Sequence, residues 1–307
     1  MTSVDDVRTA RAYLSRVAEP GAPALRAFVA QHGPVTAAGA IRNRDCPLEV
    51  LQETTTRPQL DDVDLDAAAE AGIRLITPED DEWPAAALHH VTAAFPAESD
   101  LTPPIALWAR GSGDLNHLTA AAITITGSRA ATAYGEHVAG ELAQDLGHHG
   151  HTVISGGAYG VDAAAHRGAL SAGTPTVAVL ACGVDVGYPA GNVTLLGRVA
   201  HRGGLVISEY PPGTPPARHR FLTRNRLLAA LAAAVVVVEA GPRSGVRTTA
   251  LLAGGLGKAV MAVPGPVTSA MSTVCHELIR HGGATLVTSS GEVLDVLRQA
   301  RTREHQP

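Results

Sequence analysis

The sequence contains a single lysine, Lys258, among its 307 residues. Apart from histidine, every other basic side chain is an arginine, and alanine and glycine are abundant. This composition is typical of a GC-rich genome, so the excess of arginine by itself indicates no function. The clustering of arginines along the chain is the informative feature, because genome composition does not explain it.

Cysteines, aromatic residues and long apolar runs are also scarce. The three cysteines, Cys46, Cys182 and Cys275, lie far apart without metal-ligand spacing, which is typical of a reducing cytosol. The chain has no Walker phosphate loop and no nucleophile elbow. No apolar run reaches the roughly 18 residues that span a membrane, and the N-terminus lacks a signal-peptide pattern. We therefore expect a cytoplasmic protein without metal, cofactor or membrane contact, and not an enzyme.

Most of the chain alternates short β-branched runs with helical stretches. Seven such runs cover residues 122–126, 152–154, 176–180, 205–207, 234–238, 259–263 and 284–287, and residues 73–77 and 103–109 are earlier strand candidates. This alternation predicts an α/β fold with a mainly parallel sheet and helices on both faces.

The first part of the chain has a different organisation. Residues 1–65 are predicted to form short helices interrupted by Pro20-Gly21, Gly33-Pro34 and Pro58. We expect this helical N-terminal region to precede an α/β domain over residues 66–300, followed by a frayed tail over residues 301–307.

The turns that follow the expected strands are rich in glycine and polar residues. In an open α/β sheet, ligands bind at the carboxyl ends of the strands. Glycine allows close approach to the backbone, and serine and arginine donate to phosphate at a helix start. The relevant turns are Gly127-Ser128-Arg129, Ser155-Gly156-Gly157 and Ser244-Gly245, the last followed by Arg247. Asp162, after the second turn, suits either a helix cap or a functional group.

A basic segment over residues 218–226 stands out in a chain whose formal net charge is −5. It contains Arg218, His219, Arg220, Phe221, Arg224, Asn225 and Arg226. Arginines neutralise phosphates and an aromatic ring stacks on bases, so the segment favours single-stranded nucleic acid. The alternative is an ordinary solvated helix start. We expect Phe221 to stack on a base, although it could instead staple the start of the helix.

Glu239 follows four consecutive valines and is predicted to lie at a buried strand end. A carboxylate in such a position is either catalytic or paired with an arginine. We expect the pair, with Arg224 or Arg226 as the partner, because buried carboxylates are normally paired.

Taken in their order along the chain, these motifs resemble the DNA-processing protein A family (DprA, also called Smf). The arginine-rich, lysine-poor composition resembles that of an actinobacterial member. The resemblance runs from about residue 73 to 287. It rests on Gly127-Ser-Arg129, Ser155-Gly-Gly-Ala-x-Gly-Val-Asp162 with Ala165-His166, Tyr188-Pro189, Ser208-Glu209, Phe221-x-x-Arg-Asn-Arg226, Val238-Glu-Ala240, Ser244-Gly245, Thr249-Ala250 and Val263-Pro-Gly265.

The resemblance implies an extended Rossmann-like domain that binds single-stranded DNA and forms a homodimer. It also implies a mediator that protects incoming DNA and helps to load the RecA recombinase during natural transformation. The DNA-contacting residues of the family match Arg129, Arg218 and Phe221. The full set expected to bind DNA is Gly127, Ser128, Arg129, Ser155, Gly156, Gly157, Arg218, His219, Phe221, Arg224, Asn225, Ser244, Gly245 and Arg247, with Asp162, Arg226 and Glu239 as structural residues.

The alternative function is that of a nucleotide-binding module or a nucleoside-monophosphate phosphoribohydrolase of the same superfamily fold. Those enzymes resemble one another through a Pro-Gly-Gly-x-Gly-Thr segment followed by a glutamate. Here Glu239 precedes the turn over residues 240–245 instead of following it.

Overall fold

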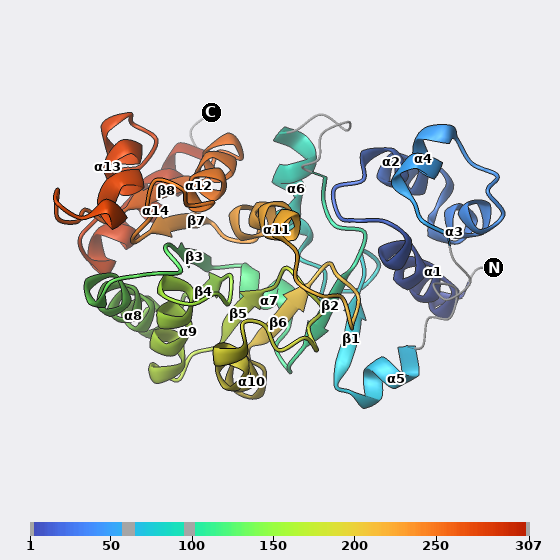
Figure 1. The fold of residues 1–307 in the computed structure, drawn as a ribbon, viewed down its shortest axis with the longest axis horizontal. Helices are drawn as coiled ribbons and strands as arrows, with labels where there is room; N and C mark the ends of the chain where they lie inside the picture. The colour runs from blue at the N-terminus through green and yellow to red at the C-terminus, as the bar shows by residue number, and fades with distance from the viewer. Residues whose placement is uncertain (1–2, 57–64, 95–101, 305–307) are drawn as a thin grey trace.

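The computed structural model describes residues 3–56, 65–94 and 102–304. A nine-stranded sheet in the order β1-β2-β6-β5-β4-β3-β7-β8-β9 runs through it (Figure 1). The strands are β1 (Ile73–Ile76), β2 (Leu107–Arg110), β3 (Ala122–Thr126), β4 (Thr152–Ser155), β5 (Thr176–Val179), β6 (Leu205–Ser208), β7 (Ala234–Val237), β8 (Ala259–Ala262) and β9 (Thr285–Leu286). Strands β3 to β9 pair in parallel, whereas β1 with β2 and β2 with β6 are antiparallel. The predicted mainly parallel α/β fold is confirmed.

Helices cover both faces of this sheet. One face carries α6 (Ala85–Ala94), α7 (Leu115–Thr119), α11 (Arg218–Ala230), α12 (Val246–Gly255) and α13 (Thr273–Arg280). The other carries α8 (Ala133–His148), α9 (Val161–Ser171), α10 (Val193–His201) and α14 (Ser290–Glu304). Within the described ranges, no helix combines the length and the apolar character that a membrane crossing requires.

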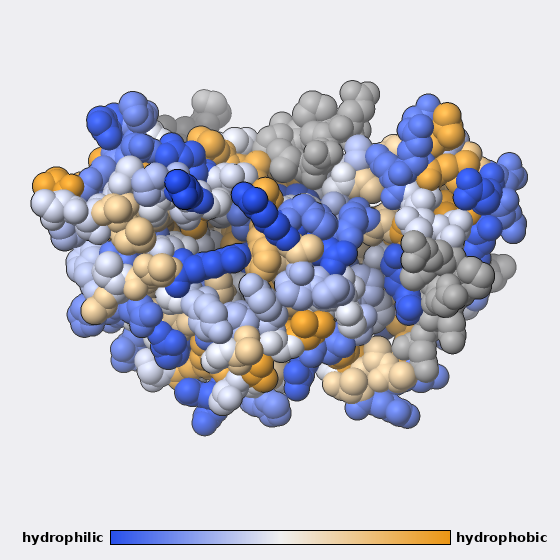
Figure 2. Space-filling view, viewed as in Figure 1, coloured by the Kyte–Doolittle hydropathy of each residue, from blue (hydrophilic) through white to orange (hydrophobic). Residues whose placement is uncertain are grey.

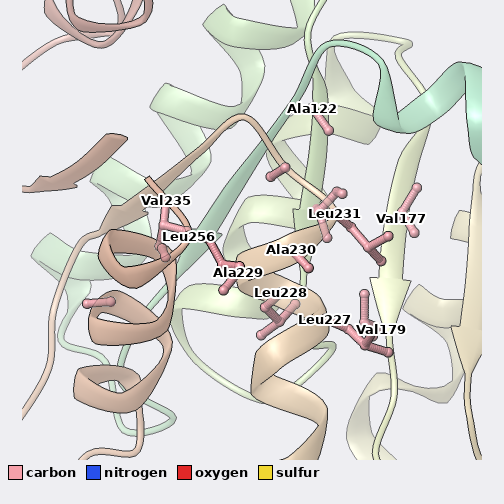
Figure 3. Packing of buried hydrophobic residues seen from close by; sticks show 14 of the residues in the cluster. Ala122, Val177, Val179, Leu227, Leu228, Ala229, Ala230, Leu231, Val235 and Leu256 are labelled. Carbon is pink, nitrogen blue, oxygen red and sulfur yellow. The ribbon is translucent and has the colours of Figure 1, made fainter. Parts of the chain in front are cut away.

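The alternation of side chains along each strand explains the two layers. Val235 and Val237 of β7 point into the core beneath α11 and α12, whereas Ala234 and Val236 point toward α8 and α14. Because both faces are covered, the strand is apolar at every position. Figure 3 shows the end of α11, Leu227 to Ala230, and the following Leu231 packed against Val177 and Val179 of β5.

The N-terminal region consists of α1 (Val4–Val17), α2 (Pro23–His32), α3 (Pro34–Arg42) and α4 (Leu48–Glu53), which share their own apolar core. The breaks at Pro20-Gly21 and Gly33-Pro34 fall between helices, whereas Pro58 lies outside the described residues. The expected boundary between residues 65 and 66 falls in the first turn of α5 (Leu65–Glu70). At the other end, α14 runs through Glu304, beyond the start of the expected tail at residue 301.

Ion pairs and hydrogen bonds attach these N-terminal helices to the sheet. Arg11 of α1 binds Glu79 in the loop after β1 at 2.6 Å, and Trp108 of β2 donates to Ser15 at 3.3 Å. The boundary between the N-terminal helices and the α/β domain is called the seam below. Across it, Glu19 accepts from Arg220 of α11 at 2.5 Å. The basic segment is therefore in contact with the N-terminal region as well as with the sheet.

The most deeply buried ion pair of the described residues anchors α11. Arg226 donates to both carboxylate oxygens of Glu209, which follows β6, at 2.5 and 2.6 Å. The two residues are only 4% and 6% exposed. Two charges so removed from water are stable only as a pair, so the contact fixes the position of α11 over the carboxyl end of β6.

We expect Glu209→Gln to lower the free energy of unfolding by about 3–5 kcal/mol, because it leaves the Arg226 charge buried without a counter-charge. Urea unfolding measures this loss. The matched control is Glu19→Gln, which breaks an ion pair whose carboxylate is half exposed and should cost less than about 1 kcal/mol. Similar losses for the two variants would contradict this assignment.

Candidate nucleic-acid interface

The order of the strands creates a crevice at one point of the sheet. The chain builds β3 to β6 outward in one direction and then returns to place β7 on the other side of β3. The loops after β3 and β7 therefore diverge toward opposite faces, and the space between their ends is where such sheets bind ligands. These two loops carry Gly127-Ser128-Arg129 and Ser244-Gly245.

A cleft of about 830 Å³ occupies this switch point. The start of α11 closes it on the remaining side. Figure 2 shows deep-blue, hydrophilic side chains over this part of the surface, between α8, α11 and α12. Of the residues expected to bind DNA, the cleft is lined by Gly127, Ser128, Arg129, Arg218, Phe221, Arg224, Asn225, Ser244 and Gly245.

The rim of the cleft is positively charged. Arg129 and Arg218 line it and are exposed, and so is Arg243, which the sequence analysis did not single out. In the part of the chain that the structure describes, none of the three has a carboxylate within ion-pair distance. Unpaired guanidinium groups around a hollow provide the donors and the charge that attract phosphates.

An aromatic group lies beside these charges. The guanidinium carbon of Arg129 lies 4.2 Å from the ring centre of Phe221, within the range of a cation–π contact. The ring of Tyr188, in the loop after β5, packs against Phe221 with centroids 5.7 Å apart and planes tilted by 51°. Phe221 is half-buried and does not belong to any of the apolar core clusters.

The floor of the cleft holds a buried arginine. Arg224 donates to the carbonyl oxygens of Gly156, at 2.8 Å, and of Val179. Burial lowers its pKa to about 10, although the Asp162 carboxylate opposes that shift, so the guanidinium is still charged at neutral pH. Burial also raises the pKa of Asp162, against the opposing charge of Arg224.

Gly156 lies between these two charges, where a larger residue would not fit. A Cβ at Gly156 would come within 2.6 Å of the Asp162 carboxylate and 2.7 Å of the Arg224 guanidinium. Asp162 accepts from the hydroxyl of Thr126 at 3.1 Å and from the amide of Ala158 at 3.3 Å. It lies inside α9, after Gly160 at the N-cap position, so it ties β3 to the turn after β4 and does not cap the helix.

Several expected DNA-binding residues do not line the cleft. Ser155, Gly156 and Gly157 are buried beneath it, and the hydroxyl of Ser155 donates to a strand carbonyl at 2.6 Å. His219 faces Glu19 across the seam at 3.6 Å. Arg247 is paired with Glu277 of α13. The spacing along the sequence could not reveal these partners, because each comes from a distant segment.

The expected pairing of Glu239 with Arg224 or Arg226 is wrong. Glu239 is 2% exposed, and its carboxylate accepts from the amide and the hydroxyl of Thr132, both at 2.8 Å. Thr132 is the N-cap residue of α8, so the helix start supplies the donors and the positive end of a dipole. Arg226 binds Glu209 instead, because α11 crosses the end of β6.

A second hollow, of about 930 Å³, lies at the seam between the N-terminal helices and the loop over residues 210–215. It is larger than the switch-point cleft, but its lining includes Glu19 and Glu53, and Arg220 is already paired there. We assign the site to the cleft, where the exposed arginines have no carboxylate partner in the part of the chain that the structure describes. Within residues 3–56, 65–94 and 102–304, no three His, Cys, Asp or Glu side chains form a metal-binding group.

Fold and cleft together define an extended Rossmann-like α/β protein with an arginine-lined crevice at its switch point. Residues 74–298 match the family model for DNA recombination-mediator protein A, which confirms the resemblance seen in the sequence. The chain belongs to this family.

Related proteins support the same assignment. The chain is 51% identical to the putative DNA processing protein DprA of Mycobacterium tuberculosis over 299 residues, which cover 95% of this chain and 75% of the relative. It is 39% identical to DprA of Streptococcus pneumoniae over 191 residues, or 62% of this chain and 66% of the relative.

Two solved structures share the fold. The X-ray structure of DNA processing protein A from Streptococcus pneumoniae has a TM-score of 0.72 at 28% identity, covering 96% of this chain and 98% of that one. DNA processing protein A from Helicobacter pylori, studied for its single-stranded DNA binding mode, has a TM-score of 0.61 at 27% identity. That match covers 74% of this chain and 96% of the Helicobacter chain.

We expect Glu239→Gln to lower the free energy of unfolding by about 1–3 kcal/mol, because an amide NH2 replaces one of the two acceptors that face Thr132. A double-mutant cycle measured by urea unfolding identifies the partner. Glu239→Gln should couple with Thr132→Val by at least about 0.5 kcal/mol and should not couple with Arg224→Met. If Glu239→Gln couples with Arg224→Met and not with Thr132→Val, Glu239 is paired with Arg224 after all.

Proposed function

We propose that this protein binds single-stranded DNA in the switch-point cleft. The single observation that carries the proposal is the set of three exposed arginines around one cleft, Arg129, Arg218 and Arg243, for which the described residues supply no carboxylate within ion-pair distance. The protein as a whole is acidic, so this local positive charge serves a local ligand. The single-stranded DNA binding mode of the Helicobacter pylori relative supports the same ligand.

In this proposal the arginines and the backbone amides divide the work. Arg129, Arg218 and Arg243 neutralise consecutive phosphates. Ser244 and Gly245 present the start of α12 as a further phosphate contact, beside the amide of Val246, which donates to the Ser244 hydroxyl at 3.3 Å. Arg224 and Asn225 form the floor of the cleft, and His219 and Arg247 take no direct part because both already face carboxylates.

The wider role is proposed from the family. We infer that the protein acts as a recombination mediator that protects single-stranded DNA, forms a homodimer and helps to load RecA during natural transformation. RecA filament assembly on an oligonucleotide, with and without this protein, tests the loading step. Light scattering at several concentrations tests the dimer, and nuclease digestion of the bound strand tests protection.

The second candidate is a nucleoside-monophosphate phosphoribohydrolase, for which the superfamily fold is the only support. Such an enzyme needs a carboxylate that can reach a ribose in the cleft. Glu239 is held by Thr132 outside the cleft lining, and Asp162, the carboxylate in the lining, is 4% exposed. Release of free base from nucleoside monophosphates, abolished by Asp162→Asn in a folded protein, would instead favour catalysis.

Binding should be electrostatic and insensitive to base sequence. Affinity for an oligo-dT strand, followed by fluorescence anisotropy, should fall with salt with a log–log slope of roughly −0.7 per neutralised phosphate. Arg218→Ala and Arg243→Ala should each reduce the slope by about 0.7. Arg198→Ala, an exposed arginine of α10 outside the cleft lining, is the control that should change neither slope nor affinity. A slope that does not respond to either cleft variant would refute the proposed track.

Arg129 should contribute more than its charge alone. Arg129→Ala should weaken oligo-dT binding by about 1.5–3 kcal/mol, because it removes a charge-assisted hydrogen bond to phosphate. Arg129→Lys should restore only part of the affinity, since the planar group that lies over Phe221 is lost. Normal binding together with a large fall in melting temperature would show that Arg129 is a structural residue.

A further inference from the structure

Among the described residues, the most exposed aromatic side chains lie at the carboxyl ends of neighbouring strands. In the described part of the chain, the aromatic residues classed as exposed are Tyr134 (40%), Tyr159 (47%) and Tyr188 (36%). They follow β3, β4 and β5, which are neighbours in the sheet. Only 3% of the chain is aromatic, so this concentration at the ligand-binding edge requires an explanation.

Structural contacts account for two of these tyrosines. The hydroxyl of Tyr134 donates to the carbonyl of Pro264 at 2.6 Å. The hydroxyl of Tyr159 accepts from the amide of Gly191 at 3.1 Å, and a Cβ at Gly191 would come within 2.9 Å of the Tyr159 ring. Each of these rings is fixed to a neighbouring loop by its polar end.

Tyr188 has no such anchor. Within the described ranges its hydroxyl has no hydrogen-bond partner, and its ring packs against Phe221, with centroids 5.7 Å apart. Phe221 is in turn covered by the Arg129 guanidinium at 4.2 Å. Phe221 therefore lies between two side chains that are more exposed than it is, and Tyr188 is the more exposed ring of the two.

The loop that carries Tyr188 is fixed before any ligand arrives. The amide of Gly183 donates to the carbonyl of Thr214 at 2.9 Å. The carboxylate of Asp185 accepts from the amide of Gly213, also at 2.9 Å. These contacts fasten the loop after β5 to the loop after β6, so Tyr188 has a fixed support at the end of the aromatic group.

We propose that Tyr188 is the side chain on which a nucleobase stacks, and that Phe221 supports it and Arg129 from beneath. This inference rests on the proposed binding of single-stranded DNA. Tyr188, Phe221 and Arg129 form a continuous row of contacts that ends in the arginine-lined cleft. A strand can place its phosphates on the arginines and one base on Tyr188, and stacking tolerates any base.

The proposal changes the role expected for Phe221. The sequence analysis expected Phe221 itself to stack on a base, because it lies between arginines. In the structure Arg129 already occupies a ring face of Phe221, so a base would have to displace a cation–π contact to stack there. The Tyr188 ring requires no such displacement.

An abasic strand separates stacking from phosphate contact. Affinities of the full chain are measured for oligo-dT and for an abasic oligodeoxynucleotide of equal length at one salt concentration. Tyr188→Ala should weaken oligo-dT binding between about 5- and 150-fold and leave abasic binding unchanged. Tyr188→Phe should bind oligo-dT like the native chain, since no described residue forms a hydrogen bond with the hydroxyl. Arg243→Ala should weaken both ligands.

The matched control is Tyr159→Ala, which removes a tyrosine of similar exposure on the next strand end and should leave oligo-dT binding unchanged. In Tyr188→Trp, oligo-dT should quench the fluorescence of the new indole and the abasic strand should not.

Unchanged oligo-dT affinity in Tyr188→Ala would overturn the inference, as would an equal loss for both ligands or an equal loss from Tyr159→Ala. If the native chain binds neither ligand, the proposed function itself fails, which is a distinct result.

Discussion

The buried arginines of α11 are the constraint on which the rest of the site depends. The last four residues of α11, Leu227 to Ala230, are all apolar and enter the core, and the preceding Arg224 and Arg226 are buried with them. Arg226 is neutralised by Glu209, and Arg224 is satisfied by strand-end carbonyls and faces Asp162. Because the charges have fixed partners, α11 can lie in only one position over the carboxyl ends of the strands. That position makes its first turn a wall of the cleft.

The basic segment over residues 218–226 is therefore divided by the fold into three parts. Arg224 and Arg226 are structural charges inside the protein, while His219 and Arg220 face Glu19 of the N-terminal region. Only Arg218 of its arginines and histidine points into the cleft from the exposed part of the helix. The rest of the positive charge around the cleft comes from Arg129 in the loop after β3 and Arg243 in the loop after β7. Most of the basic segment therefore has a structural role. The three arginines around the cleft come from three separate segments of the chain.

The carboxylates near the carboxyl ends of the strands also have partners within the protein. Glu239 satisfies the start of α8, and Glu209 satisfies Arg226, so neither carboxylate competes with a ligand for the rim arginines. Asp162 faces the cleft from below but is almost completely buried beside Arg224. The accessible charges of the cleft are consequently of one sign. An acidic protein can in this way present a local surface that attracts phosphates.

The sequence by itself determined the architecture and the loops of the site. Alternation of β-branched runs and helices located the strands to within a few residues, because a strand buried on both faces must be apolar throughout. The glycine and serine turns at the strand ends correctly indicated the edge that holds the cleft. Tertiary structure alone decided which side chains meet, because the order of the strands brings Thr132 to Glu239, Glu209 to Arg226 and Tyr188 to Phe221. These partners are separated by between 17 and 107 positions in the chain, and no local pattern encodes a contact over that distance.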